Sequence, residues 1–112
     1  MSRKEINLDL LRKLEISPEL TQRELSKEMD VSLGKINYCM QKLIEKGWIK
    51  LSNFNNHSNK SQYLYLLTPK GMEEKTRLTF SFLKIKMLEY EVLKKEIIKL
   101  KQDAKKLQPG QK

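Results

Sequence analysis

Apolar residues recur at helical spacing in three successive segments of the N-terminal half of the chain. The first segment, residues 3–16, ends before Pro18 because the residue that precedes a proline is pushed away from helical backbone angles. The second segment, residues 21–29, and the third, residues 32–46, are separated by only two residues. The predicted buried faces are, in chain order, Ile6, Leu10, Leu11 and Leu14; Leu25 and Met29; and Leu33, Ile36, Met40, Leu43 and Ile44.

Cap residues mark the ends of the second and third helices. Thr21 with Glu24 three residues later is a capping box, and Ser32 is a good N-cap residue. Gly47 supplies the left-handed position that ends the third helix. Two capped helices joined by so short a turn must cross at a steep angle, so residues 21–46 are predicted to form a helix-turn-helix.

After Gly47 the pattern changes from helical to extended. Residues 48–51 form a short strand candidate and residues 63–67 a return strand, and the segment between them is rich in Asn and Ser. We therefore expect a β-hairpin whose tip, residues 52–61, forms a wing. Three helices followed by a hairpin predict a winged helix-turn-helix domain over residues 1–68.

A long final helix is predicted over residues 69–108. Thr68 is its cap, Pro69 fits the first helical position, and the next proline is Pro109. Gly71 is the one weak helix former in its first turn. The fold class is thus mainly α with a small β-hairpin, with the winged domain followed by a long C-terminal coiled-coil helix and a disordered tail at residues 109–112.

A heptad repeat in the long helix predicts dimerisation through a coiled coil. Lys86 is the one polar residue in the seam, and the acidic g positions Glu89 and Glu96 match the basic e positions Lys94 and Lys101 of a parallel partner. The apolar seam residues are Leu83, Tyr90, Leu93, Ile97, Leu100, Ala104 and Leu107. A second stripe, expected to pack on the winged domain of the same chain or of the partner, consists of Leu78, Phe82, Ile85, Leu88 and Val92. The alternative is a single long helix folded onto its own domain.

The charge distribution favours a polyanionic partner. The chain carries 23 Lys and Arg against 14 Asp and Glu, a net charge of +9. Residues 31–67 hold five lysines and one acidic residue, so the excess within the globular part falls on the third helix and the hairpin, where phosphate neutralisation would supply affinity for DNA. The candidate DNA-contacting residues are Thr21, Gln22, Arg23, Ser32, Gly34, Lys35, Asn37, Tyr38, Gln41, Lys42, Asn59 and Lys60.

Gly34 weakens the third helix by up to ~1 kcal/mol relative to alanine, so its presence needs a reason. One explanation is close approach of the backbone to DNA, and the other is a tight contact with a neighbouring helix.

The sequence contains few residues that could form a catalytic or metal-binding site. Cys39 and His57 are the single cysteine and the single histidine, so neither a disulfide nor a thiolate zinc cluster is expected. Cys39 is expected to be a small buried apolar residue. We expect no enzyme activity, no cofactor, no metal and no membrane segment, and a cytoplasmic location.

The helix-turn-helix segments 21–29 and 31–38 and the run Leu66-Leu67-Thr68-Pro69-Lys70-Gly71 resemble those of the MarR-type winged-helix regulators, over roughly residues 5–100. The similarity is greatest to a short subgroup associated with exopolysaccharide gene clusters, which makes exopolysaccharide genes candidate targets. The resemblance implies a homodimer on a palindromic double-stranded DNA operator, with the recognition helix, residues 32–46, in the major groove and the wing at the flanking groove.

Two other functions remain open at this stage. One is a coiled-coil adaptor that binds another protein and contacts nucleic acid weakly or non-specifically; the self-complementary heptad charges favour a homodimer over it. The other is an RNA-binding winged helix, which the few aromatic residues on the predicted contact face make less favourable.

Overall fold

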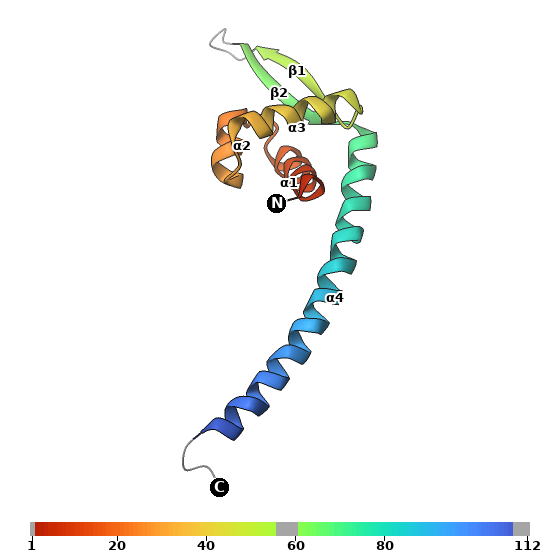
Figure 1. Ribbon diagram of the computed structural model, residues 1–112. Coiled ribbons are helices and arrows are strands. Elements are labelled where there is room, and N and C mark those ends of the chain that lie inside the picture. Colours follow the sequence, from red (N-terminus) through yellow and green to blue (C-terminus); the bar gives the residue numbers. More distant parts are fainter. Residues whose placement is uncertain (1, 56–60, 109–112) are drawn as a thin grey trace. The chain divides into compact units, whose positions relative to one another are not determined.

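The computed structural model describes the backbone of residues 2–55 and 61–108. It confirms the predicted fold class: a winged helix-turn-helix followed by a long helix (Figure 1). The chain divides into two compact units between Thr79 and Phe80. The elements are α1 (Arg3–Ile16), α2 (Gln22–Met29), α3 (Leu33–Glu45), β1 (Ile49–Asn55), β2 (Ser61–Leu67) and α4 (Pro69–Leu107). The predicted tail, residues 109–112, lies outside the described residues.

Hydrogen bonds from cap residues fix where the helices of the helix-turn-helix begin and end, as predicted. The Thr21 hydroxyl accepts from the Glu24 backbone N–H at 3.1 Å, and the Glu24 carboxylate accepts from the Thr21 N–H at 3.3 Å, which completes the capping box. The Ser32 hydroxyl accepts from the Lys35 N–H at 3.2 Å. Asp30 ends α2 with a φ of 53°, and Gly47 follows α3 with a φ of 75°. These left-handed residues allow the chain to turn sharply after each helix.

The hydrophobic core of the winged domain joins α1, α2, α3 and β1. Cys39 is buried, as predicted, and Leu78 of α4 is also buried. The fully buried side chains are Ile6, Leu10, Leu11, Leu14, Leu25, Ile36, Cys39, Met40, Leu43 and Ile49. Among the described residues no buried side-chain polar atom lacks a hydrogen-bond partner.

Two predicted core positions of α3 are wrong. Leu33 is 40% exposed and Ile44 is 38% exposed, whereas Cys39 is 1% exposed. The buried arc of the helix is centred between Ile36 and Cys39, and both Leu33 and Ile44 lie on the far side of Ile36, about 60–80° around the helix at 100° per residue. The stripe read from the sequence was therefore rotated relative to the surface that the neighbouring elements cover.

The hairpin is longer than predicted. Its antiparallel register runs from Ile49 opposite Leu67 to Asn55 opposite Ser61, so residues 52–55 and 61 belong to strands and not to the tip. The turn-forming character of Asn and Ser suggested a loop there, but ladder hydrogen bonds use the backbone alone and tolerate polar side chains on a solvated ribbon. Predicted wing residues Asn59 and Lys60 lie outside the described residues.

The start of α4 is tied to the end of α3 and the start of β1. The Thr68 hydroxyl donates to the Gly47 carbonyl and accepts from the Gly71 N–H at 3.0 Å, and the Thr68 N–H donates to the Trp48 carbonyl at 3.1 Å. A Cβ placed on Gly71 would lie 1.9 Å from the Trp48 carbonyl oxygen. Gly71, weak as a helix former, therefore lets α4 pass close to the backbone of residue 48.

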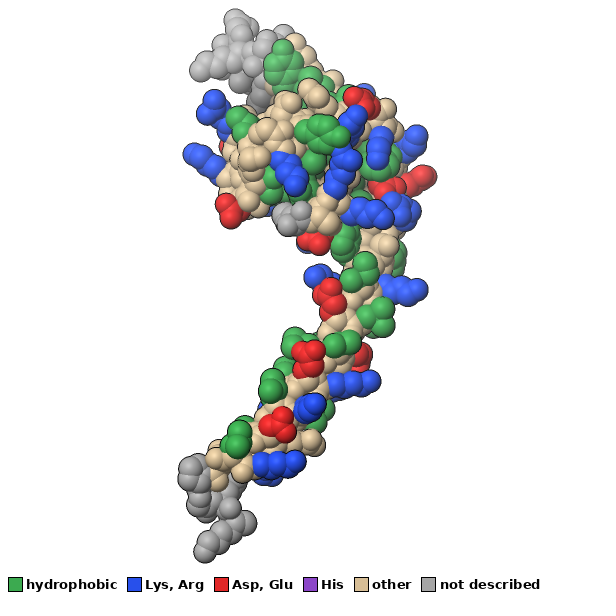
Figure 2. Space-filling view, in the orientation of Figure 1, with side chains coloured by type: hydrophobic (Ala, Val, Ile, Leu, Met, Phe, Trp, Pro, Cys, Tyr) green, Lys and Arg blue, Asp and Glu red, His purple; other side chains and the backbone are tan. Residues whose placement is uncertain are grey.

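The second unit is the part of α4 from Phe80 onward. All seven predicted seam residues are exposed in the single chain, from 43% at Ile97 to 80% at Leu107 among the large ones. Figure 2 shows hydrophobic side chains interspersed with charged ones along this helix. Ile85, Leu88 and Val92 of the second stripe are also exposed within this unit, and their packing on a winged domain, of the same chain or of the partner, stays a prediction. None of the helices in the described segments is both long and apolar enough to cross a membrane.

Candidate nucleic-acid interface

The α3 helix has one buried face and one exposed face that carries most of the predicted DNA contacts. Ile36, Met40 and Leu43 are buried without residual exposure and fix the helix on the core. On the opposite side Lys42 is half-buried, and the exposed predicted contacts are Gly34, Lys35, Asn37, Tyr38 and Gln41. The core thus holds α3 rigidly and directs a polar, basic face to solvent, which is how a recognition helix meets a DNA groove.

Gly34 lies on this exposed face with open space around it. A Cβ at this position would meet no atom within 4 Å, so a tight contact with a neighbouring helix does not explain the glycine. The other explanation offered by the sequence, close approach of the helix backbone to DNA, stays a prediction.

A cluster of cations surrounds Tyr38. The Arg3 guanidinium carbon lies 4.7 Å from the centre of the Tyr38 ring, and the Lys42 ammonium lies 5.5 Å from it. Both distances are within the range of cation–π attraction. Lys42 also pairs with Glu45 at 3.3 Å, one turn further along α3. The exposed face of α3 therefore presents an aromatic ring flanked by positive charge.

Arg3 was missed by sequence reasoning. It opens α1, and no periodicity within α1 relates it to a residue 35 positions later in α3. Its proximity to Tyr38 arises because α1 and α3 pack against each other in the core. A basic residue at the start of the first helix was the one available signal, and it carried no information about this contact.

Gln22 links three elements of the winged domain. The Asn37 side-chain amide of α3 donates to the Gln22 oxygen at 3.0 Å, and the Gln22 amide of α2 donates to the Tyr65 hydroxyl of β2 at 3.3 Å. Gln22 and Tyr65 are half-buried, whereas Asn37 is exposed. Two predicted DNA contacts, Gln22 and Asn37, are thus brought together, and Tyr65 joins them as a residue that the sequence did not single out.

The remaining predicted contacts lie at helix starts. Thr21 and Ser32 are exposed N-caps of α2 and α3, and Arg23 is exposed in the first turn of α2. Free N–H groups at a helix start, with the positive end of the helix dipole, suit a phosphate. Within the described residues no three His, Cys, Asp or Glu side chains are grouped so as to hold a metal ion.

Comparison with known proteins supports this assignment of the fold. Residues 3–50 match the family described as winged helix-turn-helix DNA-binding, which covers α1 to α3 and the start of β1. No curated protein sequence matches the chain.

Solved structures of several bacterial proteins share the fold. The smu.1704 protein from Streptococcus mutans is 16% identical, with a TM-score of 0.73 over 83% of this chain and 90% of that chain. FabT from Streptococcus pneumoniae, solved in complex with DNA, is 21% identical, with a TM-score of 0.51 over 91% and 76%. MarR from Staphylococcus aureus, solved with salicylate and kanamycin, is 18% identical, with a TM-score of 0.56 over 90% and 71%. The chain therefore has the winged-helix fold found in MarR regulators, and these low identities establish the fold alone.

Proposed function

We propose that this chain is a homodimeric transcriptional regulator that binds double-stranded DNA sequence-specifically. Helix α3 would enter the major groove and the β1–β2 hairpin would reach the flanking groove. The observation that carries the proposal is that α3 has one buried and one exposed face. Its apolar side packs in the core, and its exposed side presents Gly34, Lys35 and Tyr38 to solvent, where DNA could contact them. FabT, which shares the fold, was solved with DNA bound.

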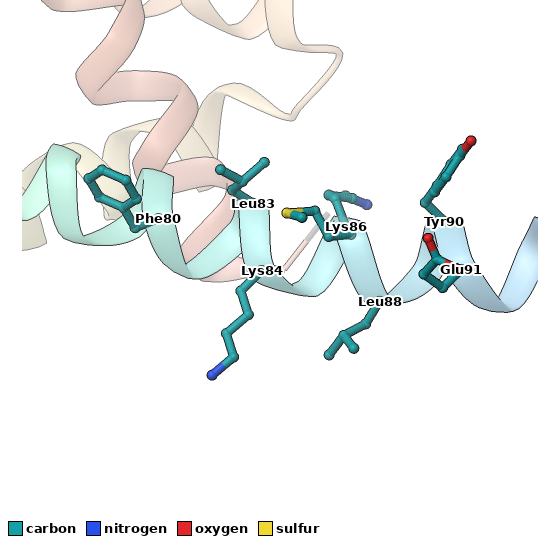
Figure 3. Close-up of a pocket in the computed structure, with 8 residues that line it drawn as sticks. Phe80, Leu83, Lys84, Lys86, Leu88, Tyr90 and Glu91 are labelled. Atoms are coloured by element: carbon teal, nitrogen blue, oxygen red, sulfur yellow. The ribbon is translucent and has the colours of Figure 1, made fainter.

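Dimerisation through α4 is the second part of the proposal. The seam side chains from Leu83 to Leu107 form an exposed apolar surface, which is typical of an interaction site. An isolated helix has little intrinsic stability in water, so packing against a second helix would stabilise this one. Figure 3 shows Phe80, Leu83 and Tyr90 projecting from one side of this helix and Lys84 and Leu88 from the other. In a parallel pair the g-position Glu89 of one chain would face the e-position Lys94 of the other.

A two-fold dimer would read a palindromic operator. Its two α3 helices would contact half-sites about 10 base pairs apart, or a multiple of that spacing. Exopolysaccharide genes are the target class suggested by the sequence resemblance. An adaptor that binds a different protein is the competing function, and the exposed seam is the observation that favours it; the self-complementary charges favour a second copy.

Selection of bound fragments from the genomic DNA of the source organism, followed by footprinting, tests the proposal. We expect protection of an inverted repeat and a particle mass of two chains on each site. Recovery of fragments without a common motif would contradict specific recognition. Recovery of exopolysaccharide promoters among the fragments would support the target class, and their absence would contradict it. A monomer in solution and on DNA would contradict the dimer.

A further inference from the structure

The hydrogen-bonded chain Asn37–Gln22–Tyr65 joins residues that are 15 and 43 positions apart in the sequence. It begins at Tyr65 on the hairpin, passes through Gln22 on α2, and ends at the exposed amide of Asn37 on α3. The fold holds the half-buried side chains of Gln22 and Tyr65 in place, so the hydrogen bond to Gln22 keeps the exposed amide of Asn37 in one orientation. An exposed amide would otherwise rotate freely.

The donors and acceptors of Asn37 that have no partner among the described residues define a ligand. A carboxamide has two N–H donors and one carbonyl acceptor. One N–H of Asn37 is used by the Gln22 oxygen, which leaves one N–H and the oxygen Oδ1. In the major groove, adenine presents the matching pair, the N7 acceptor and the N6 amino donor, whereas guanine presents two acceptors.

We propose that Asn37 reads an adenine in the major groove, and that Gln22 and Tyr65 are positioning residues that orient its amide. This inference rests on the proposed function and adds to it one base of the operator. Lys35, which only donates, suits a guanine or a phosphate and does not compete for the same base edge.

The direction of these hydrogen bonds leaves Tyr65 with a donor. Because the Tyr65 hydroxyl accepts from Gln22, its own hydrogen can be donated, and the part of the chain that the structure describes supplies no acceptor for it. A DNA phosphate only accepts hydrogen bonds. By accepting from the Gln22 amide nitrogen, the Tyr65 hydroxyl holds Gln22 in the orientation that leaves its oxygen facing Asn37.

The experiment is selection of binding sites from random duplex DNA by the full chain and by its variants. The wild type should select an adenine at one position in each half-site. Asn37→Ala should accept all four bases at that position and keep its preferences elsewhere. Gln22→Ala and Tyr65→Phe should weaken the preference at that same position. Tyr63→Phe is the matched control, because Tyr63 lies two residues earlier on the same face of β2 and should leave the preference unchanged.

A conservative variant separates positioning from a general structural role. Gln22→Glu keeps an oxygen that accepts from Asn37 and replaces the amide donor by a second oxygen, to which the Tyr65 hydroxyl can donate instead. It should therefore retain the adenine preference, although its added negative charge weakens binding at every position. Thermal unfolding of each variant reports whether it folds. Replacing the selected adenine by 7-deazaadenine, which lacks N7, should weaken wild-type binding about tenfold and leave Asn37→Ala unaffected.

The outcomes distinguish this inference from the proposed function. If the wild type selects a site and folded Asn37→Ala selects the same site with the same base preferences, Asn37 is not the reader and the inference is overturned, while specific DNA binding stands. The inference also fails if the position that loses its preference prefers guanine or cytosine. If the wild type selects no sequence, both the inference and the proposed function fail.

Discussion

At the scale of the residue, Gly34 and Gly71 have opposite surroundings. A Cβ on Gly34 would enter open space, whereas a Cβ on Gly71 would overlap the Trp48 carbonyl oxygen. Both lie in the first turn of a helix, where glycine lowers helix propensity. Gly71 therefore leaves room for the chain itself, whereas nothing within the chain requires a glycine at Gly34, as the proposed approach of DNA to the backbone would explain.

Gly34→Ala should separate folding from DNA binding. Alanine favours the helix and meets no neighbour, so the free energy of unfolding should rise by about 0.5–1 kcal/mol. Affinity for the operator should fall at least about tenfold, equivalent to ~1.4 kcal/mol, because the methyl group would hold the helix backbone away from DNA. Denaturant titration and DNA titration measure the two effects. A variant that is more stable and binds normally would refute the recognition-helix assignment at this position.

Lys35→Ala should weaken binding through lost charge and lost contact. In a plot of log affinity against log salt concentration, the slope should fall by about 1 if Lys35 touches a phosphate. If Lys35 reads a base instead, the slope should stay and discrimination at one position should relax. Lys99→Ala removes the same charge from an exposed position of α4 and serves as the control. Equal small losses for both variants would argue against a specific role for Lys35.

At the scale of the element, the contact between the start of α4 and residue 48 organises the winged domain. Thr68 caps α4 while bonding to Gly47 and to the Trp48 backbone, so the end of α3, the first strand and the last helix meet at one point. The β1–β2 hairpin is held by this contact at its base and by Tyr65, whose backbone N–H donates to the Pro18 carbonyl at 3.0 Å.

Gly71→Ala should loosen that contact. The new methyl group would require the backbone of residue 48 or of α4 to move, at a cost of about 1–3 kcal/mol in the free energy of unfolding. Thermal unfolding measured beside Gly34→Ala provides a matched comparison, since both variants make the same chemical change in a first turn. A stability for Gly71→Ala equal to or above that of the wild type would show that the close approach is not maintained in solution.

At the scale of the whole molecule, the predicted coiled coil determines how many copies act together. Ile97 is a seam position and Ile98 is the next residue outside the seam, and their exposed fractions are 43% and 49% in the single chain. The heptad pattern assigns them different roles although their exposure is nearly the same.

Ile97→Lys should convert the dimer to a monomer, because a charge at a seam position would be buried against its copy in the partner. Ile98→Lys, the matched control, should remain dimeric. Light scattering after size exclusion measures mass, and far-ultraviolet circular dichroism should show lost helicity in Ile97→Lys, since a lone helix is marginally stable. Two variants with the same mass would contradict the heptad assignment.

The local elements were predictable because their determinants are local. The capping box at Thr21, the N-cap at Ser32, the turn at Gly47 and the boundary at Thr68 depend on residues a few positions apart, and all appear in the structure. The length of the hairpin was mispredicted because backbone pairing leaves little trace in the types of the side chains involved.

The sequence by itself determined the order of helices and strands, the basic excess on α3 and the hairpin, and the heptad pattern of α4, since each is a periodicity or a short-range rule. Only the tertiary structure decided which side of α3 is covered, that Arg3 lies over Tyr38, and that Gln22 joins Asn37 to Tyr65. Those relations depend on the packing of elements distant in sequence, where rotation of a helix by a few tens of degrees changes which side chains meet.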